Sequence, residues 1–537
     1  MKNVLYALII IMIVLVIIFL RKALQPANQS LEHKQVTPPS HPVILLMIDS
    51  LMNEPLQKAV KEGRAPAFKF LMEHGHYYPN VISSYPTMSV TIDSTLLTGT
   101  YSDKHQVPGL VWFDETQKRL VNYGSARAEV FKLGIKNVME YILYCLNHSH
   151  LSNDVETIHE ALDKIGLQSA SINALVYRGN EKMILRPPKA LSKLNLMPKF
   201  QVQTPFLFSY GALAQYHPKN NQNNQPWKAF GFNDKFTAEE LKYFIQNRKL
   251  PSFTIAYFPD LDKNVHKEGP IHPINGIEKV DKELQEILNV YGSWDKALKD
   301  AVWIVMGDSG QAEVGKDKNR SLVELRSILD SYKIHDVKEP VKEDDQIVLG
   351  LNERMAFIYN LDQNITIEEI VKHLKQDERI QIIAWKNGTN VNAVAGGKNG
   401  VFTFRPDGEY TDEYDQSWFL NGEYSILDLS INEKLVGYGV YPDVLARLHS
   451  SLHSHSGNYI IVDAKPGFEF VSEGTPTHPG GAAHGSIHKQ DSLVPMIVTG
   501  TSTKPEHMRI VDLKPWILHL LRQGTDKQNN IVEKRFD

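Results

Sequence analysis

Three aspartates follow apolar stretches of the chain. Asp49 directly follows the run VILLMI, Asp262 comes shortly after SFTIAYFP, and Asp308 directly follows AVWIVMG. Short continuous apolar runs are typical of strands buried on both faces of a sheet. The carboxyl ends of parallel strands meet at one edge, where such sheets bind ligands. One such aspartate often only caps a helix, but three together favour a metal or catalytic site.

Two histidines occur in contexts that suit the same chemistry. His266 follows Asp262 by four residues, and His484 lies in the glycine-rich loop PGGAAHGS. Carboxylate and imidazole ligands suit zinc or a similar divalent ion. An isolated Asp-x-x-x-His is weak evidence, whereas small residues around His484 allow close backbone approach. His478 and His488 flank that loop, and each is expected either to support the site from outside or to be structural.

A hydroxyl-rich stretch, SSYPTMSVTIDSTLLTG, contains a candidate nucleophile. Its apolar spacing predicts a helix that begins near Ser89 and ends at Gly99. A serine at a helix start is commonly an N-cap. The same position also favours anions, because backbone N–H groups and the helix dipole point there. With cations beside it, such a serine could attack phosphorus. The residues alone leave both roles open.

Composition excludes several classes of function. The 537 residues carry a formal net charge of -4, and no basic stripe is present, so we expect no nucleic-acid binding. Cys145 is the one cysteine in the chain, which rules out an intramolecular disulfide and a cysteine-based redox or zinc-finger site. Its apolar context predicts a packed core thiol.

The order of the patterns predicts an α/β fold. Apolar strands alternate with helical segments such as IHEALDKIGLQ and INGIEKVDKELQEILNVYG, which indicates a mainly parallel sheet sandwiched by helices. Residues 352–446 are β-rich with one clear helix, TIEEIVKHLKQDE, and are interpreted as a small α+β insertion. The run NYIIVDAKPGFEFV then suggests a return to the core. The predicted division is therefore 41–351 and 447–537 for the core, with 352–446 inserted.

The first residues form a separate segment. Residues 4–20 are almost wholly apolar and uncharged, just long enough to cross a hydrocarbon layer of about 30 Å. No good cleavage site precedes Arg21, so we expect 1–22 to be an uncleaved membrane anchor and 23–40 a polar linker. A cleaved signal peptide is the alternative. Charges on the two sides are nearly balanced and do not indicate the orientation.

The ordered set of motifs resembles the alkaline phosphatase superfamily, and most closely its type I phosphodiesterase/nucleotide pyrophosphatase family. The resemblance covers nearly the whole chain after residue 40. It rests first on the strand that ends in Asp49 and on Ser89, which lies nine positions before Thr98-Gly99. Asp262-x-x-x-His266, followed by Gly269-Pro270, and His484-Gly485 match further family motifs. Asp308-Ser309-Gly310 is a partial match to the family's Asp-His-Gly.

This resemblance implies an alkaline phosphatase-like fold and a hydrolase of phosphate esters, with a small phosphate ester or nucleotide-like molecule as substrate. Ser89 would form a covalent phosphoryl intermediate that water then hydrolyses. Two divalent ions are implied. The first, expected to be zinc, would be held by Asp262, His266 and His484. The second would be held by Asp49, Asp308 and Ser89. Together with the predicted anchor, the resemblance implies a single-pass cell-membrane protein whose catalytic part lies outside the cytoplasm.

Two positions depart from the family pattern. Ser309 stands where the family has a histidine ligand, and Leu110 stands where this branch usually has an asparagine that donates to phosphate. Because a hydroxyl is a weaker ligand than imidazole, the second ion could be loosely held, not zinc, or absent. Two alternatives therefore stay open: a phosphotransferase that moves head groups between lipid and polymer, and a catalytically weakened binding protein on the same fold.

Overall fold

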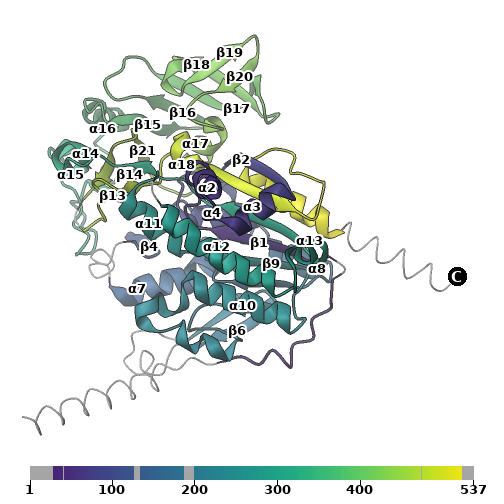
Figure 1. Cartoon of the computed structure of the whole chain (residues 1–537). Helices are drawn as coiled ribbons and strands as arrows, with labels where there is room; N and C mark the ends of the chain where they lie inside the picture. The colour runs from purple at the N-terminus through teal and green to yellow at the C-terminus, as the bar shows by residue number, and fades with distance from the viewer. Residues whose placement is uncertain are drawn as a thin grey trace, which may run out of the picture.

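A seven-stranded sheet forms the centre of the larger part of the molecule (Figure 1). The computed structural model describes residues 28–39, 41–125, 134–186, 199–271, 273–472 and 474–522. The strand order is β2-β24-β10-β1-β9-β5-β8, and all strands but β24 run in one direction. Their bounds are β1 Val43–Ile48, β2 His76–Ile82, β5 Ser169–Ile172, β8 Leu207–Ser209, β9 Phe253–Phe258, β10 Val302–Gly307 and β24 Leu493–Thr499.

Strand β1 lies between its parallel neighbours β10 and β9, with Ile48 level with Gly307 and Phe258. All six residues of each of these strands are buried. Continuous apolar runs are expected where helices cover both faces of a parallel sheet. The alternate residues of β1 belong to two separate cores, one on each face. The predicted mainly parallel sheet between helices is confirmed.

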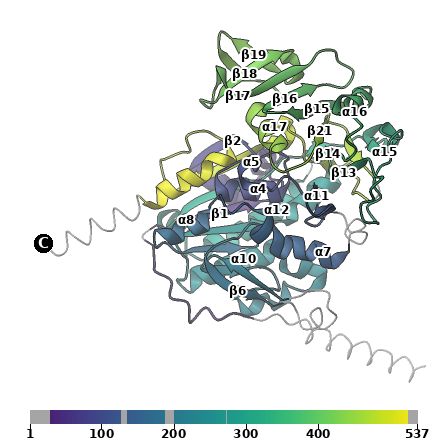
Figure 2. The same cartoon turned by 180° about the vertical axis from the view of Figure 1, so that it is seen from behind.

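Helices cover both faces of this sheet (Figures 1 and 2). One core is completed by α2 Asn53–Lys61, α3 Pro66–Glu73, α10 Asp234–Gln246, α11 Asp260–Glu268, α12 Ile274–Asn289 and α13 Trp294–Asp300. The other is completed by α4 Ser89–Thr98, the π-helix η1 Tyr141–His150, α8 Ile158–Lys164, α17 Val444–Leu452 and residues 513–522. Cys145 lies half-buried in η1 against the second core, as expected.

Helix α4 is buried on every side after its first residue although six of its ten residues are polar. Three of its hydroxyls bond back to the preceding turn: Ser94 Oγ donates to Val90 O at 2.7 Å, Thr95 Oγ1 to Thr91 O at 3.0 Å and Thr98 Oγ1 to Ser94 O at 2.6 Å. A polar side chain costs little inside a protein once its hydrogen bond is made. The helix ends at Gly99 in the left-handed conformation (φ 65°). The start and end predicted from the sequence are confirmed.

A second, mostly antiparallel sheet of nine strands packs beside the first and lies above it in Figure 1. The helix expected within residues 352–446 is present as α16, and Thr366 and Glu369 form a capping box at its start. The bounds are β13 Ile347–Asn352, β14 Met355–Asn360, α16 Ile367–Leu374, β15 Ile380–Asn387, β16 Asn390–Val394, β17 Phe402–Asp412, β18 Ser417–Gly422, β19 Leu429–Asn432, β20 Leu435–Tyr438 and β21 Tyr459–Ala464.

The expectation that NYIIVDAKPGFEFV returns to the first sheet is wrong. Its strand, β21, lies in the second sheet between β14 and β15. A buried apolar strand has the same composition in either sheet, so its pattern could not indicate which one it joins. Strand β13 also lies partly outside the range expected for the insertion. The division of the chain into domains stays a prediction.

Shorter elements complete the described part of the fold. They are α5 Ser102–His105, β3 Val111–Asp114, β4 Arg119–Asn122, α7 Ile135–Glu140, β6 Glu181–Leu185, β7 Phe200–Thr204, η2 Pro218–Gln222, η3 Pro226–Gly231, β11 Ala312–Glu313, α14 Lys318–Ser321, β12 Leu322–Glu324, α15 Leu325–Ile328, η4 Tyr424–Ile426, β22 Glu469–Val471, β23 Ala482–Ala483, α18 Lys489–Ser492 and η5 Ile510–Asp512. The predicted anchor, 1–22, and residues 23–27 and 40 of the predicted linker lie outside the described residues. The rest of the predicted linker packs against the fold: Leu31 is buried in the core that α2 and α12 complete, and Lys34 Nζ donates to Phe206 O at 3.0 Å. Within the described ranges, no helix is long and apolar enough to span a membrane.

Candidate metal and catalytic site

The three aspartates predicted to share one sheet edge do lie together there. Ser50 links them: its backbone N–H donates to Asp308 Oδ1 at 2.8 Å, and its hydroxyl donates to Asp262 Oδ1 at 3.0 Å. The same hydroxyl lies 3.4 Å from Asp49 Oδ1. The parallel register brings the ends of β9, β1 and β10 to one level, which places these side chains side by side.

His266 and His484 present the same ring nitrogen to this edge. The Nδ1 of His266 donates to Ala482 O at 2.8 Å, and the Nδ1 of His484 donates to Thr87 O at 2.5 Å. A carbonyl can only accept, so both Nε2 atoms are left without a proton in the neutral rings. They lie 3.1 Å and 4.0 Å from Asp262 Oδ1. Histidines that bind metals are commonly held in this way through the other nitrogen.

Asp262, His266 and His484 form the first group of candidate ligands, and the electrostatics of this group indicate a site for positive charge. Although burial opposes it, the Asp262 and Glu353 carboxylates raise the pKa of His266 to about 10. Against the effect of burial, His266 and His484 lower the pKa of Asp262. A divalent ion would replace the proton on His266, because a ligating imidazole must be neutral. The donor set therefore fits a divalent cation.

A second group is formed by Asp49 and Asp308 with Ser309. Asp49 Oδ2 accepts from Tyr257 OH at 2.6 Å, and Asp308 Oδ1 accepts from the N–H of Ser309 at 2.6 Å. Asp308 Oδ2 and the Ser309 hydroxyl are buried without a hydrogen-bond partner. Burial raises the pKa of Asp49 and of Asp308, and the neighbouring carboxylates add to the effect. Buried oxygens of Asp308 and Ser309 that lack a hydrogen-bond partner, close to the Asp49 carboxylate, also fit a cation.

Ser89 is not the N-cap of its helix. Helix α4 begins at Ser89, and the N-cap is Met88, which makes no side-chain hydrogen bond. The half-buried Ser89 instead lines a cavity of about 610 Å³ together with Asp49, Asp262, His266 and His484. The first backbone N–H groups of an α-helix have no partner within the helix and attract anions. This placement favours the nucleophile role left open by the sequence.

The remaining predicted histidines differ in their placement. His478 lies in the site: its ring stacks on that of His266 with centroids 4.3 Å apart, and its Nδ1 is 2.9 Å from Glu469 Oε2. His488 is at the start of α18, where its side chain accepts from the N–H of Gln490 and caps the helix. Of the two, His478 alone belongs to a possible metal-binding group among the described residues.

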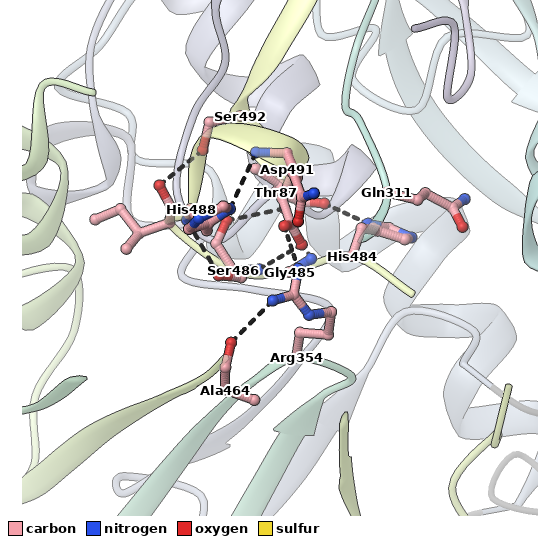
Figure 3. A network of polar contacts seen from close by, with 12 residues as sticks. Thr87, Gln311, Arg354, Ala464, His484, Gly485, Ser486, His488, Asp491 and Ser492 are labelled. Carbon is pink, nitrogen blue, oxygen red and sulfur yellow. Dashed lines mark hydrogen bonds and ion pairs between the residues drawn. The ribbon is translucent and has the colours of Figure 1, made fainter. Parts of the chain in front are cut away.

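The loop that carries His484 is held by a buried polar network (Figure 3). Arg354 and Asp491 form an ion pair with both side chains fully buried, and Arg354 Nη2 also donates to Ala464 O at 2.9 Å. Asp491 Oδ1 accepts from the N–H of Ser486 at 3.2 Å. Thr87 Oγ1 accepts from the N–H of Gly485 at 2.7 Å. Breaking a buried ion pair is costly, so this network gives His484 a fixed position.

Several residues of the site were not expected from the sequence: Ser50 and Tyr257, described above, and also Gln311 and Glu353. Gln311 Nε2 donates to Asp262 Oδ1 at 2.7 Å and to Ser50 Oγ at 2.8 Å. Glu353 lies in the turn between β13 and β14, and its carboxylate faces both His266 and His484 at 3.9 Å. Gln311 is three residues after Asp308, which is a local signal. No sequence signal pointed to Glu353, because long-range docking of the second sheet brings it here.

Comparison with known proteins identifies the family of this chain. Residues 43–487 match the family model described as type I phosphodiesterase / nucleotide pyrophosphatase. The chain belongs to this family. The predicted resemblance is thereby confirmed, and the protein is a hydrolase that acts on phosphoric ester bonds. No protein among the curated sequences matches the chain closely enough to add to this.

Solved structures of similar fold agree with the family. Human ectonucleotide pyrophosphatase/phosphodiesterase 5 is similar at a TM-score of 0.55 and 15% identity, covering 90% of this chain and 95% of that one. An inactive variant of the murine protein in complex with AMP gives 0.54 at 15% identity, with the same coverage. Phosphonoacetate hydrolase from Sinorhizobium meliloti 1021, in complex with phosphonoformate, gives 0.53 at 14% identity, covering 92% and 99%. At these identities the likeness establishes the fold.

Helix α4 of this phosphodiesterase-family chain also buries an unexpected acid, Asp93, one turn after Ser89. Its Oδ2 accepts from the N–H of Leu175 at 2.9 Å, whereas Oδ1 is buried without a partner. Burial raises the pKa of Asp93 to about 7, and the charge of Asp308 adds to the effect. The helix beneath the candidate nucleophile therefore carries a carboxyl group that changes charge near neutral pH.

We expect Asp93→Asn to change how stability depends on pH. Below pH 4 the carboxyl is neutral in both the folded and the unfolded chain. As pH rises from 4 to 7 the unfolded chain loses this proton first, so the wild type loses up to about 4 kcal/mol of unfolding free energy that the variant keeps. Urea unfolding of the cation-free proteins at pH 4.5 and 8 measures the difference. The exposed Asp330→Asn is the control, and an equal Asp93→Asn effect at both pH values would contradict the prediction.

Proposed function

We propose that the protein hydrolyses phosphate esters in a metal-dependent reaction through a phosphoryl group on Ser89. The observation that supports this is the cavity, which brings the Ser89 hydroxyl to the same space as Asp49, Asp262, His266 and His484. Asp262, His266 and His484 would hold the first divalent ion, for which we propose zinc. Asp49, Asp308 and Ser89 would hold a second, with the Ser309 hydroxyl as a weak ligand.

The chain's own residues account for binding and attack. The phosphate binds at the start of α4, where the N–H groups of Ser89 and Val90 are free of helix bonds and the helix dipole favours negative charge. Ser89 Oγ then attacks phosphorus, its proton passes to water, and the ester oxygen leaves with the bond electrons. Bound cations would lower the pKa of the serine hydroxyl and offset the charge of the phosphoryl oxygens.

Hydrolysis of the seryl phosphate completes the cycle. The oxygen of a water molecule bonds to phosphorus, the bond to Ser89 Oγ breaks, and Ser89 recovers a proton as the phosphate leaves. The Nδ1 bond of His484 to Thr87 O fixes the cation site relative to the entry of α4. Such fixed placement of reacting groups is a major source of rate acceleration.

Ser89→Ala is expected to abolish turnover and leave the fold intact. Removing the nucleophile should lower kcat by about 10³-fold or more, because the oxygen that forms the covalent intermediate is lost. Hydrolysis of bis-p-nitrophenyl phosphate and p-nitrophenyl phosphate by the full chain measures the effect and the preferred ester. Ser94→Ala, the same change on the same helix outside the cavity, is the matched control. Turnover retained in Ser89→Ala would exclude Ser89 as the nucleophile.

The lining of the cavity supports a second candidate, in which the phosphate ester carries an apolar chain and the head group can pass to an acceptor other than water. Beyond the polar end, most of the wall is apolar or aromatic. Leu110 is part of this wall. The nearby Asn352 does not take the place of the asparagine that is usual at position 110, because its side-chain amide is bonded to the backbone of Leu110 and Val111. The other large apolar or aromatic residues of the wall are Met88, Tyr123, Met139, Ile142, Leu143, Leu175, Tyr210, Phe232, Tyr257, Leu351 and Phe470.

A series of p-nitrophenyl alkyl phosphates tests this candidate. From methyl to octyl, kcat/KM should rise by up to about fourfold for each methylene that becomes buried. Met139→Gln, which makes one side chain of the wall polar at similar length, should reduce the gain of the octyl ester and leave the methyl ester unchanged. Independence of chain length would favour a small substrate. Competition between water and a lipid alcohol as acceptor separates hydrolysis from transfer.

We also propose that residues 1–22 anchor the protein in the cell membrane, with the catalytic part outside the cytoplasm. The support is the apolar run at residues 4–20. The full chain should stay in the membrane fraction after a carbonate wash, and a chain that begins at Leu31 should not. Added protease should remove the catalytic part from intact cells. Release of the full chain by carbonate, or protection from protease, would contradict the anchor or the orientation, respectively.

A further inference from the structure

The chain that follows the proposed anchor is fixed to the fold from Asn28 onward. The backbone N–H of Gln29 donates to Gln215 O at 2.8 Å, and its side-chain Nε2 donates to Phe208 O at 3.2 Å. Asn28 Oδ1 accepts from Gln215 Nε2 at 2.7 Å. Leu31 is buried in the core beneath. Asn28, and not the start of β1, is therefore the point at which the folded part begins.

The length of chain before Asn28 limits how far this point can lie from the proposed anchor. Only residues 23–27 separate Lys22, at the end of the anchor, from Asn28. The six steps from Lys22 to Asn28 span at most about 21 Å of extended chain. A compact chain of this length has a radius of gyration of about 23 Å, so most of its surface lies farther away than that. If residues 1–22 cross a membrane, the side of the fold around Asn28 faces it.

Gln215, which holds Asn28, belongs to a loop of residues 210–233 that is braced by buried amides. Asn224 Nδ2 donates to Gln215 Oε1 at 2.6 Å, and Asn233 Nδ2 donates to Lys228 O at 2.9 Å. The side chains of Gln215, Asn224 and Asn233 are all buried. Buried polar networks whose hydrogen bonds are made give a segment a rigid structure. The loop therefore holds its exposed side chains in fixed positions.

Trp227 is the most prominent of these exposed side chains. It is 69% exposed, the largest exposure among the large hydrophobic side chains of the described residues. The backbone that follows it is strained, because Ala229 and Phe230 both have positive φ, 50° and 53°. Such strain persists where the surrounding structure enforces it, and it is common at functional sites. Tryptophan is enriched where a membrane meets water, since its ring is apolar at one end and polar at the other.

The charge of the same loop suits a lipid surface. Residues 210–233 include no aspartate or glutamate, whereas Lys219 and Lys228 are exposed. Exposed lysines beside an aromatic side chain are typical of segments that lie on lipid head groups. A protein partner could also accept an exposed tryptophan. The short chain between the anchor and Asn28 favours the membrane, because it places that surface on this side of the fold.

We propose that residues 210–233 form the membrane-facing side of the catalytic part, with Trp227 at the level of the lipid head groups. This inference rests on the proposed anchor. The same loop contributes Tyr210 and Phe232 to the wall of the catalytic cavity. Their rings pack edge to face, with centroids 4.6 Å apart. One loop therefore serves both the lipid surface and the apolar wall, which suits a phosphate ester that carries an apolar chain.

Tryptophan fluorescence of the full chain in lipid vesicles tests the inference. The vesicles contain phosphatidylglycerol and a phosphatidylcholine brominated close to the head group, because bromine quenches an indole that it contacts. Emission should be lower than in vesicles without bromine, and Trp227→Phe should lose most of that quenching. Trp294→Phe, the same change at the other tryptophan that is not buried, is the matched control and should keep it. Equal quenching in the wild type and Trp227→Phe would overturn the proposal.

A second measurement identifies the membrane-facing side without relying on Trp227. A fluorophore is attached at Gln222→Cys in the loop or at Leu435→Cys in β20, each combined with Cys145→Ala, and the vesicles carry acceptor-labelled head groups. Both positions are exposed. Strand β20 lies at the top of Figure 1, whereas α10, which directly follows the loop, lies in its lower part. Energy transfer should be more efficient from position 222, and equal or reversed efficiencies would overturn the proposal.

Sedimentation of the full chain with the same vesicles separates failure of the anchor from failure of this inference. A wild type that does not sediment with them contradicts both proposals. A wild type that sediments but shows no quenching of Trp227 contradicts this inference alone and favours a protein partner at the loop.

Discussion

Repulsion between carboxylates buried at one sheet edge is the constraint on which this structure depends. Parallel strands bring Asp49, Asp262 and Asp308 to the same level, in a place where burial already disfavours charge. The surrounding groups offset this with donors: the N–H and hydroxyl of Ser50, the hydroxyl of Tyr257 and the amide of Gln311. Asp308 Oδ2 nevertheless remains without a hydrogen-bond partner, and the imidazoles of His266 and His484 face Asp262. A folded chain that tolerates this arrangement is one built around positive charge.

The second sheet is part of the site. Its first hairpin carries Asn352, Glu353 and Arg354 in succession, and each acts on a different part of the edge. Asn352 holds the backbone of Leu110 at the cavity wall, Glu353 faces the histidines, and Arg354 pairs with Asp491 beneath the His484 loop. Placement of this hairpin therefore sets the cavity wall, the charge at the candidate cation site and the loop geometry together.

Much of the fold could be predicted because local pattern and burial agree. The runs that became β1 and β10 are apolar throughout and that of β9 is nearly so, as is typical of strands between two helical layers. Asp49 and Asp308 directly follow their strands, and Asp262 lies four residues after the end of β9. Helix α4 had a readable start and a glycine at its end. The sequence could not indicate Glu353, because a glutamate in a hairpin is ordinary until the hairpin is docked. It also could not assign β21 to a sheet, since both sheets bury such strands equally.

The bond from His484 Nδ1 to Thr87 O has a thermodynamic consequence. Thr87 precedes Ser89 by two residues, and its hydroxyl also accepts from Gly485. The segment of His484 and Gly485 and the entry to helix α4 are therefore joined by two hydrogen bonds. In the proposed reaction, an ion bound to His484 and a substrate held at the helix start would be coupled through these bonds, and each would change the binding affinity of the other by the same factor.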